Sequence, residues 1–359
     1  MLKAHHRNRN LLGLDRERGL AEFARYHLIQ KAKAGRVTDA WIAQTETQLR
    51  EVIAYLGPNR PLGSITVRDV QGFTNYLRDT PNAKGRRRTD GTIRHYLASL
   101  SNLYARAQSE GRVQPGYNPV SALMEKPVAR REEAQWLEVP DAALFLEAAR
   151  IYQPGADALP FMYPLVATFL LTGGRKSEVL GLELDDVSFN RGTVTFRPNK
   201  WRRLKTHTSH RTIPLWPQLE GILRAHVFSV DRPLGSLLFP SSQSSSERVV
   251  TDIRKSLDGI AELAGRQRGE IRTKIFRHTY CTARLQTTDR GAAVAPFTVS
   301  RELGHGGRAM VERVYGHLGQ NRHRSEVVEY GIEQHAEVLR PTLEALRRDY
   351  PVWRDCLPL

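Results

Sequence analysis

The chain has 359 residues, 40% of them hydrophobic, which is enough to form the cores of two ordinary domains. Its formal net charge is +16 at pH 7, and its two cysteines lie far apart, which argues against a disulfide framework and a cysteine-based metal site. No apolar stretch has the length of a membrane helix, and the basic N-terminus lacks the apolar core of a secretory signal. We therefore expect a cytoplasmic protein with no membrane partner.

The excess of positive charge favours a polyanionic partner, because such a partner relieves the self-repulsion of the folded chain. An acidic membrane surface would also attract a basic protein, but no amphipathic basic anchor segment is visible. The charge therefore predicts a nucleic acid as the partner.

The first half of the sequence has apolar residues spaced three and four apart, as in amphipathic helices. We expect helices over 39–57, 64–80 and 89–111, with Ser64 as the candidate cap of the second and Thr89 or Asp90 as that of the third. The segment before the third helix is strongly basic, and a solvated charge run is one interpretation of it. The other is that the cations at the start of this helix bind DNA phosphates or let the helix enter the major groove; they are Lys84, Arg86, Arg87, Arg88 and Arg94.

The second half begins after a charged, proline-containing connection, whose linker we place at 126–136. Helices are expected over 139–152 and after Phe161. Alternating residues predict two strands, one at Val194 and Phe196 and one at 212–215, joined by a basic turn. The chain is expected to be helical from there to about Leu318, and again within 322–350. The fold class is thus mainly α with a small antiparallel β-sheet.

Several common catalytic motifs are absent: there is no Walker loop, GxGxxG, HExxH or CxxC, and no evident carboxylate cluster of the nuclease type. We therefore expect no cofactor and no metal. Instead, cations stand on four short motifs: TGGRKSEVLGL, KTHTSHRTIPL, RTKIFRHTYCT and LGHGGRAMVERVYGHL. These motifs contain Arg175 and Glu178, then Lys205, then Lys274, Arg277 and His278, and finally His305 and Tyr315.

The four motifs, in this order, resemble the catalytic signature of the tyrosine recombinases of the integrase and Xer type. That family shows T-G-x-R-x-x-E, a lysine in a β-turn before R-x-[IV]-P-L, H-x-x-R-H, L-G-H and Y-x-H-[LV]. Lys274 stands where the family usually has histidine, and Tyr315 lies one residue further from His305 than is usual. The resemblance covers about 136–318, and the helical first half is similar to the family's core-binding domain.

The resemblance implies DNA cleavage by Tyr315 through a 3′-phosphotyrosyl bond, and the chemistry of the residues fits such a reaction. Two arginines, Arg175 and Arg277, would hold the scissile phosphate through bidentate forks. Lys205 would protonate the leaving 5′-oxygen, and His305 would donate a hydrogen bond to the phosphate. We further expect Lys274 to add positive charge, Glu178 to orient an arginine, and His278 to be structural. Near the basic turn, the candidates for contact with DNA are Arg202, Arg203 and Arg211.

The family resemblance also gives the predicted domain organisation: a basic tail at 1–17, a helical core-binding domain at 18–125, a mixed α/β catalytic domain at 137–320 and a helical tail at 321–359. It implies a homotetramer on two sites of double-stranded DNA, with strand exchange through a Holliday junction. The last helices could dock on a neighbouring protomer or pack on their own domain. Two other functions stay open: DNA relaxation of the type IB topoisomerase kind, and DNA binding without catalysis.

Overall fold

The computed structural model describes residues 19–129, 133–153, 155, 159–204, 207–230, 235–241, 246–307, 309, 311–312 and 325–354. The chain forms two compact units, Met1–Glu132 and Glu133–Leu359, and the division between them falls within the predicted linker 126–136. Among the described residues, no helix has the length and apolarity needed to cross a membrane.

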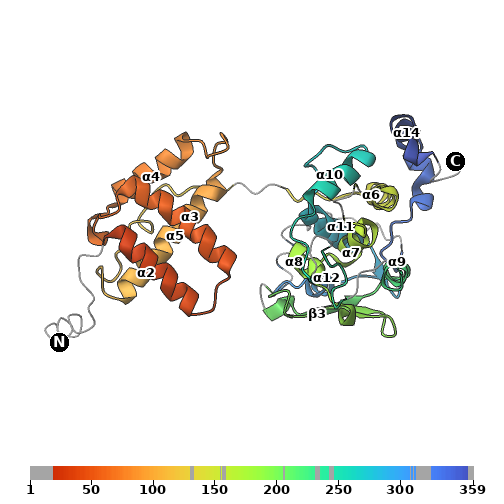
Figure 1. Ribbon diagram of the computed structural model, residues 1–359, viewed down its shortest axis with the longest axis horizontal. Coiled ribbons are helices and arrows are strands. Elements are labelled where there is room, and N and C mark those ends of the chain that lie inside the picture. The colour runs from red at the N-terminus through yellow and green to blue at the C-terminus, as the bar shows by residue number, and fades with distance from the viewer. Residues whose placement is uncertain are drawn as a thin grey trace. The chain divides into compact units, whose positions relative to one another are not determined.

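The described part of the N-terminal unit, residues 19–129, is a bundle of four helices, drawn in red to orange in Figure 1. Threonines begin three of them: the side chains of Thr38, Thr66 and Thr89 each accept a backbone N–H of the first turn. Thr66, rather than Ser64, is therefore the cap of the third helix, and Asp69 completes a capping box there. The helices are α2 (Leu20–Lys33), α3 (Asp39–Leu56), α4 (Val67–Asp79) and α5 (Asp90–Ser109), with a short 3-10 turn η1 (Leu62–Ser64) between α3 and α4.

One apolar face of each helix in this unit points into a common core. Phe23, Val52, Phe73 and Leu100 are fully buried members of it, one from each helix. The hydroxyl of Tyr104, also buried, donates to the carbonyl of Leu62 at 2.9 Å and so ties α5 to the η1 turn. The spacing of apolar residues had indicated the last three of these helices, while α2 was not predicted.

The C-terminal unit is built around one apolar helix, α7 (Met162–Thr172), in which every residue except Tyr163 is buried. Figure 1 shows it among the other helices of the unit, and it contacts α6, α9 and α11. This helix is the one predicted after Phe161. Its neighbours are α6 (Val139–Ile151), α8 (Lys176–Leu180), α9 (Pro217–Val227), α10 (Arg254–Leu263), α11 (Thr273–Leu285) and α12 (Pro296–Glu302).

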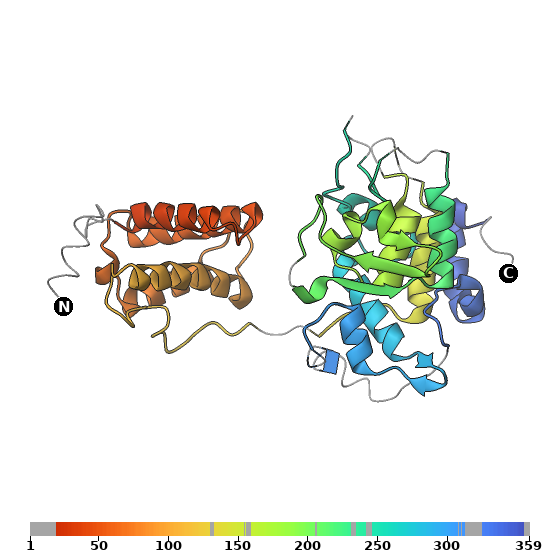
Figure 2. The same ribbon diagram turned by 90° about the horizontal axis from the view of Figure 1, so that it is seen from below.

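A three-stranded antiparallel sheet lies on one side of this unit, as Figure 2 shows. Its strands are β1 (Val187–Ser188), β2 (Thr193–Phe196) and β3 (Arg211–Pro214), preceded by the turns η2 (Leu184–Asp186) and, before β3, η3 (His207–Ser209). Val194 pairs with Ile213 and Phe196 with Arg211, and all four side chains are buried. The predicted strands and the predicted fold class, mainly α with a small antiparallel sheet, are confirmed.

A second pair of short strands was not predicted. β4 (Thr288–Asp289) and β5 (Ala292–Ala293) form an antiparallel hairpin between α11 and α12, in a region that we expected to be helical. The turn between the strands contains Arg290 at φ 51 and Gly291 at φ 80. Left-handed backbone at two consecutive residues forms the tight turn of a hairpin and cannot continue a helix, which explains the difference.

The C-terminal segment packs on its own unit. It comprises η4 (Ile332–His335), α14 (Ala336–Asp349) and η5 (Pro351–Trp353). Leu339, Leu343 and Leu346 lie on the buried face of α14, and the indole N–H of buried Trp353 donates to the carbonyl of Leu263 at 2.9 Å. The sequence left open whether these last helices dock on a neighbouring protomer or pack on their own domain, and in this conformation they pack on their own domain.

Candidate active site

The candidate site begins at the tight turn between α7 and α8, which contains Gly173 and Gly174. Gly173 ends α7 with a left-handed backbone at φ 59. A Cβ atom at Gly173 would lie 2.7 Å from the ring of Tyr280, and one at Gly174 would lie 2.5 Å from Val179. Glycine is therefore needed at both positions, because the turn is packed against its neighbours with no room for a side chain.

Arg175 follows this turn directly and is oriented by Glu178. The backbone N–H of Arg175 donates to one carboxylate oxygen of Glu178 at 2.9 Å, and its Nη1 donates to the other at 2.7 Å. Nη1 also lies 3.3 Å from the Ser209 hydroxyl. The Nε and Nη2 atoms have no hydrogen-bond partner among the described residues, and 27% of the side chain is exposed. Arg175 can thus offer two parallel N–H groups to an incoming oxyanion.

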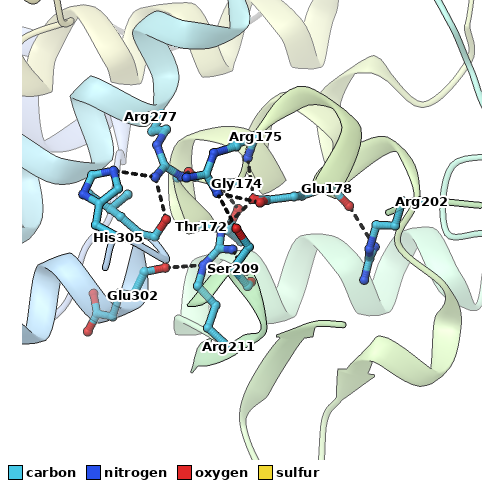
Figure 3. Close-up of polar contacts among 12 residues, drawn as sticks. Thr172, Gly174, Arg175, Glu178, Arg202, Ser209, Arg211, Arg277, Glu302 and His305 are labelled. Carbon is cyan, nitrogen blue, oxygen red and sulfur yellow. Dashed lines mark hydrogen bonds and ion pairs between the residues drawn. The ribbon is translucent and has the colours of Figure 1, made fainter. Parts of the chain in front are cut away.

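Glu178 also binds a second arginine, Arg211 of β3, which lies behind Arg175. Nη2 of Arg211 donates to Glu178 at 2.8 Å, and its Nη1 donates to the carbonyl of Ser209 at 2.9 Å. Burial alone would raise the pKa of Glu178, but Arg211 and Arg175 lower it to about 2. The carboxylate is therefore ionised near neutral pH and partly neutralises two neighbouring guanidinium groups (Figure 3).

Arg277 enters the same cluster from α11. Its Nη1 donates to the carbonyl of Gly173 at 2.9 Å, and its Nη2 donates to the carbonyl of Leu303 at 2.5 Å. Burial, followed by Arg175 and Arg211, lowers the pKa of Arg277, although a guanidinium group stays protonated at neutral pH. The cluster is thus a partly buried concentration of positive charge that an anion would stabilise.

His305 completes the cluster at the turn after α12. Its Nε2 lies 2.9 Å from Nη2 of Arg277. Because a guanidinium group can only donate, Nε2 accepts, and the proton of a neutral ring is on Nδ1. Nδ1 is buried and has no hydrogen-bond partner among the described residues. Burial and the charges of Arg277, Arg175 and Arg211 lower the pKa of His305 to about 4, so the ring is neutral at physiological pH.

Two further predicted residues lie on α11 beside Arg277. Lys274, one turn before Arg277, is exposed. His278 is partly buried, and burial together with Lys274 and Arg277 lowers its pKa to about 4. The structure therefore places both residues next to Arg277 on α11.

Lys205 and Tyr315, the predicted acid and nucleophile, lie outside the described residues. One described residue near each of them in the chain can be placed. Ser209, four residues after Lys205, contacts Arg175 and Arg211. Val311, four residues before Tyr315, is 1% exposed and belongs to the core of the C-terminal unit.

The predicted DNA-binding residues divide into exposed and buried ones. Lys84, Arg86, Arg87, Arg94 and Arg203 are exposed and remain candidates for contact with phosphate. The other three are held in ion pairs, which argues against the predicted contact with DNA, because their guanidinium groups are already bound and shielded. They are Arg88 with Glu51, Arg202 with Asp186, and Arg211 with Glu178.

Sequence reasoning missed the backbone groups and buried side chains that hold the arginines. Carbonyl oxygens of Gly173, Ser209 and Leu303 each accept from one of them. A carbonyl has no side-chain signature, so no motif could have shown these contacts. Arg211 had a signal, since it directly precedes the predicted strand 212–215 and lies two positions before Ile213, on the same face in the alternation of that strand.

Residues 147–322 match the sequence model of the phage integrase family. This part of the chain belongs to that family. The match includes all four cationic motifs and confirms the family recognised from them; it identifies the chain as a site-specific tyrosine recombinase, an enzyme that transfers DNA strands. No curated protein sequence matches the chain.

Solved integrase structures share the fold. A Tn1549 transposon integrase in complex with a circular intermediate DNA is 17% identical, with a TM-score of 0.62, and the alignment covers 82% of this chain and 94% of that one. A lambda integrase dimer bound to a COC′ core site is 15% identical, with a TM-score of 0.57 and coverage of 84% and 76%. The XerH site-specific recombinase bound to its difH substrate is 16% identical, with a TM-score of 0.54 and coverage of 76% and 75%.

Proposed function

We propose that this integrase cleaves double-stranded DNA at one phosphodiester with Tyr315, and that Arg175, Arg277 and His305 bind the scissile phosphate. The observation that carries the proposal is the convergence of these last three side chains from three separate elements. Arg277 lies beside Arg175. Within the described part of the chain, the Nε and Nη2 atoms of Arg175 and the buried Nδ1 of His305 have no hydrogen-bond partner. A phosphate oxygen would satisfy this donor, which is costly to leave unpaired in the interior.

The cluster fits a reaction in which negative charge builds up on the non-bridging oxygens of a phosphate. Guanidinium groups held in place before the substrate arrives stabilise that charge without rearranging during the reaction. Carbonyls of Gly173 and Leu303 fix Arg277, and Glu178 fixes Arg175. Because the two arginines are positioned by different elements, they can hold two oxygens of one phosphate from different directions.

In the proposed cleavage step, the phenolate oxygen of Tyr315 attacks phosphorus and the bond to the 5′-oxygen breaks. The neighbouring guanidinium groups favour the phenolate form of Tyr315. Lys205 gives its proton to the departing 5′-oxygen, and a 3′-phosphotyrosyl bond remains. Attack by another 5′-hydroxyl reverses these events, so strands are rejoined without ATP. Lys274 contributes positive charge near the DNA.

We further propose that four protomers act on two DNA sites and exchange strands in pairs through a Holliday junction. In this arrangement the N-terminal unit contacts the duplex with its exposed cations at 84–94. The Tn1549 integrase is in complex with a circular intermediate DNA, the lambda integrase dimer is bound to a core site and XerH to its difH substrate, which supports DNA as the substrate of the shared fold. The match to the phage integrase family favours recombination over relaxation of the topoisomerase kind and over binding alone.

A nicked substrate with a randomised core tests the proposal for any target site. A library of such duplexes, with the nick beside the expected cleavage position, loses a short piece on cleavage, which traps the covalent complex. We expect wild-type protein to retain a subset of sequences through a bond that survives denaturation, and Tyr315→Phe to retain none. Trapping by Tyr315→Phe, or none by the wild type, would refute the proposal.

A further inference from the structure

A buried carboxylate lies between α11, which contains Arg277, and α12, which precedes His305. Glu302 ends α12, and its Oε2 accepts the hydroxyl of Tyr280 at 2.9 Å. Nε of Arg284 lies 3.2 Å and 3.1 Å from the two oxygens of the same carboxylate. All three side chains are buried, and Tyr280 and Arg284 both belong to α11. We call Tyr280, Arg284 and Glu302 the buried triad.

The backbone at the same end of α12 holds the cationic cluster. The carbonyl of Glu302 accepts from Nε of Arg211 at 2.5 Å, and the next carbonyl, that of Leu303, accepts from Nη2 of Arg277 at 2.5 Å. Figure 3 shows the Glu302 carbonyl pointing toward Arg211, with His305 on the same turn. Carbonyls at the end of a helix lack partners within it, so they are free to bind these arginines.

Glu302 makes both the backbone and the side-chain contacts. The side chain of Glu302 fixes the end of α12 to α11, while its carbonyl fixes Arg211. His305 follows on the same turn, where its N–H donates to the carbonyl of Ser300 at 2.9 Å. A shift of Glu302 would therefore move Arg211, the Leu303 carbonyl that holds Arg277, and His305 together.

The ion pair between Glu302 and Arg284 holds the end of α12 firmly on α11. Arg284 also donates to the hydroxyl of Thr287 at 2.7 Å and lies over the ring of Trp216, 5.1 Å from its centre. These contacts leave little freedom for the guanidinium group. A carboxylate that meets a fixed guanidinium and a tyrosine hydroxyl in a buried space has one favourable position, and a partly satisfied network would be costly.

We propose that the buried triad of Tyr280, Arg284 and Glu302 is a positioning cluster for DNA cleavage, which sets the spacing of Arg211, Arg277 and His305 without touching DNA. The inference rests on the proposed function, because its importance for cleavage depends on the roles given to Arg277 and His305. Small displacements matter in such a site: a shift of about 1 Å can lower a rate by roughly 100-fold.

The test compares Glu302→Gln and Tyr280→Phe with Leu343→Ala, a core variant in α14, distant in sequence from the cationic motifs. Single-turnover cleavage of a nicked substrate, DNA affinity and thermal unfolding are measured for the full chain. We expect each triad variant to cleave about 10- to 100-fold more slowly than the wild type with unchanged DNA affinity. Leu343→Ala is expected to unfold at a lower temperature and still cleave at the wild-type rate below it.

A second measurement follows the titration of His305 by NMR, which a general loss of stability would not change. Burial lowers the pKa of this ring most. The charged and titratable groups that face it lower the pKa further; they are Arg277, Arg175, Arg211 and His278. If the triad variants move Arg211 and Arg277 away, the pKa of His305 rises toward its ordinary value. Loss of the negative charge in Glu302→Gln would by itself lower that pKa, so a rise reports displacement.

The outcomes separate the triad from the proposed function. Cleavage by both triad variants at the rate of Leu343→Ala, with an unchanged titration of His305, would overturn the inference. If Glu302→Gln does not fold, Tyr280→Phe decides alone, since it removes only one hydroxyl. If the wild type forms no covalent complex with DNA, the proposed function fails, and the titration of His305 still shows whether the triad positions the cluster.

Discussion

Nη2 of Arg277 lies 2.9 Å from Nε2 of His305, and this contact fixes the form of the histidine. The arginine donates, so the ring accepts at Nε2 and carries its proton on Nδ1. A protonated ring would lose this contact and would bring a second positive charge against Arg277. The histidine is thus held as a neutral donor.

The pH dependence of cleavage follows from this contact. The pKa of His305 is lowered to about 4, so its neutral form is complete above about pH 5 and is lost as the pH falls through 4. We expect cleavage between pH 6 and pH 8 to show no titration of His305, and NMR of the free protein to show its midpoint well below the ordinary value. A midpoint near 6.5 would contradict the proposed tautomer.

Replacing Glu178 by glutamine should destabilise the protein and slow cleavage. The change leaves Arg211 buried without its counter-charge, at a cost of about 3 kcal/mol in the free energy of unfolding. Glu220→Gln, which breaks the exposed pair with Arg224 on α9, is the matched control and should change stability little. Denaturant unfolding of the two variants measures the difference, and equal losses would contradict the role assigned to Glu178.

The stability difference between wild type and Glu178→Gln depends on pH in a defined way. The pKa of Glu178 is lowered from its ordinary 4.5 to about 2, so its contribution to stability is complete above pH 4.5 and is lost as the pH falls toward 2. The stability difference between wild type and Glu178→Gln should therefore shrink across this range. A difference that stays constant down to pH 2 would show that the ionised form is not the stabilising one.

Two glycine-to-alanine changes test the packing of the turn before Arg175. Gly174→Ala places a Cβ 2.5 Å from Val179 and 2.8 Å from Phe196, so we expect a loss of about 1–3 kcal/mol and slower cleavage. Gly221 is exposed within α9, and nothing lies within 4 Å of the position of its Cβ. Gly221→Ala should leave cleavage unchanged and raise stability by up to about 1 kcal/mol. Unfolding of both variants by denaturant decides; similar effects would contradict this account.

Among the basic residues before α5, Arg87 and Arg88 should behave differently. Arg87 is exposed, whereas the side chain of Arg88 is 8% exposed and paired with Glu51. If Arg87 binds phosphate, Arg87→Ala lowers the slope of log affinity against log salt by about 0.9. Arg88→Ala should instead lower the unfolding temperature with no change in that slope. Titrations of duplex DNA at several salt concentrations measure both, and a reversed pattern would contradict the assignment.

Local patterns were enough to predict much of the fold and the main members of the cluster. Apolar spacing showed α3 to α5, and the Gly-Gly turn with Arg175 and Glu178 showed where a cation would be oriented. The assignment of Arg88, Arg202 and Arg211 to DNA stays a prediction, and their side chains are shielded in ion pairs that the sequence did not show, because a sequence shows charge but not burial. Each of the three meets its carboxylate across a gap of 16 to 37 positions, and no local pattern reports such a contact.

The buried triad also depends on contacts between residues distant in the sequence, which local patterns do not show. Tyr280 and Arg284 lie on α11 near Arg277, but Glu302 joins them only because α12 packs on α11 after the β4–β5 hairpin. That hairpin depends on left-handed backbone at Arg290 and Gly291, which the helical expectation for this region did not include. The position of a buried acid could therefore be assigned only once the path of the chain was known.

The most direct test of the account is to identify the residue that becomes joined to DNA. Wild-type protein trapped on a nicked substrate can be digested with trypsin and nuclease, and its peptides analysed by mass spectrometry. We predict a nucleotide adduct on Tyr315 within the peptide 314–322, and its loss in Tyr315→Phe. An adduct on any other residue, or its persistence in Tyr315→Phe, would contradict the account.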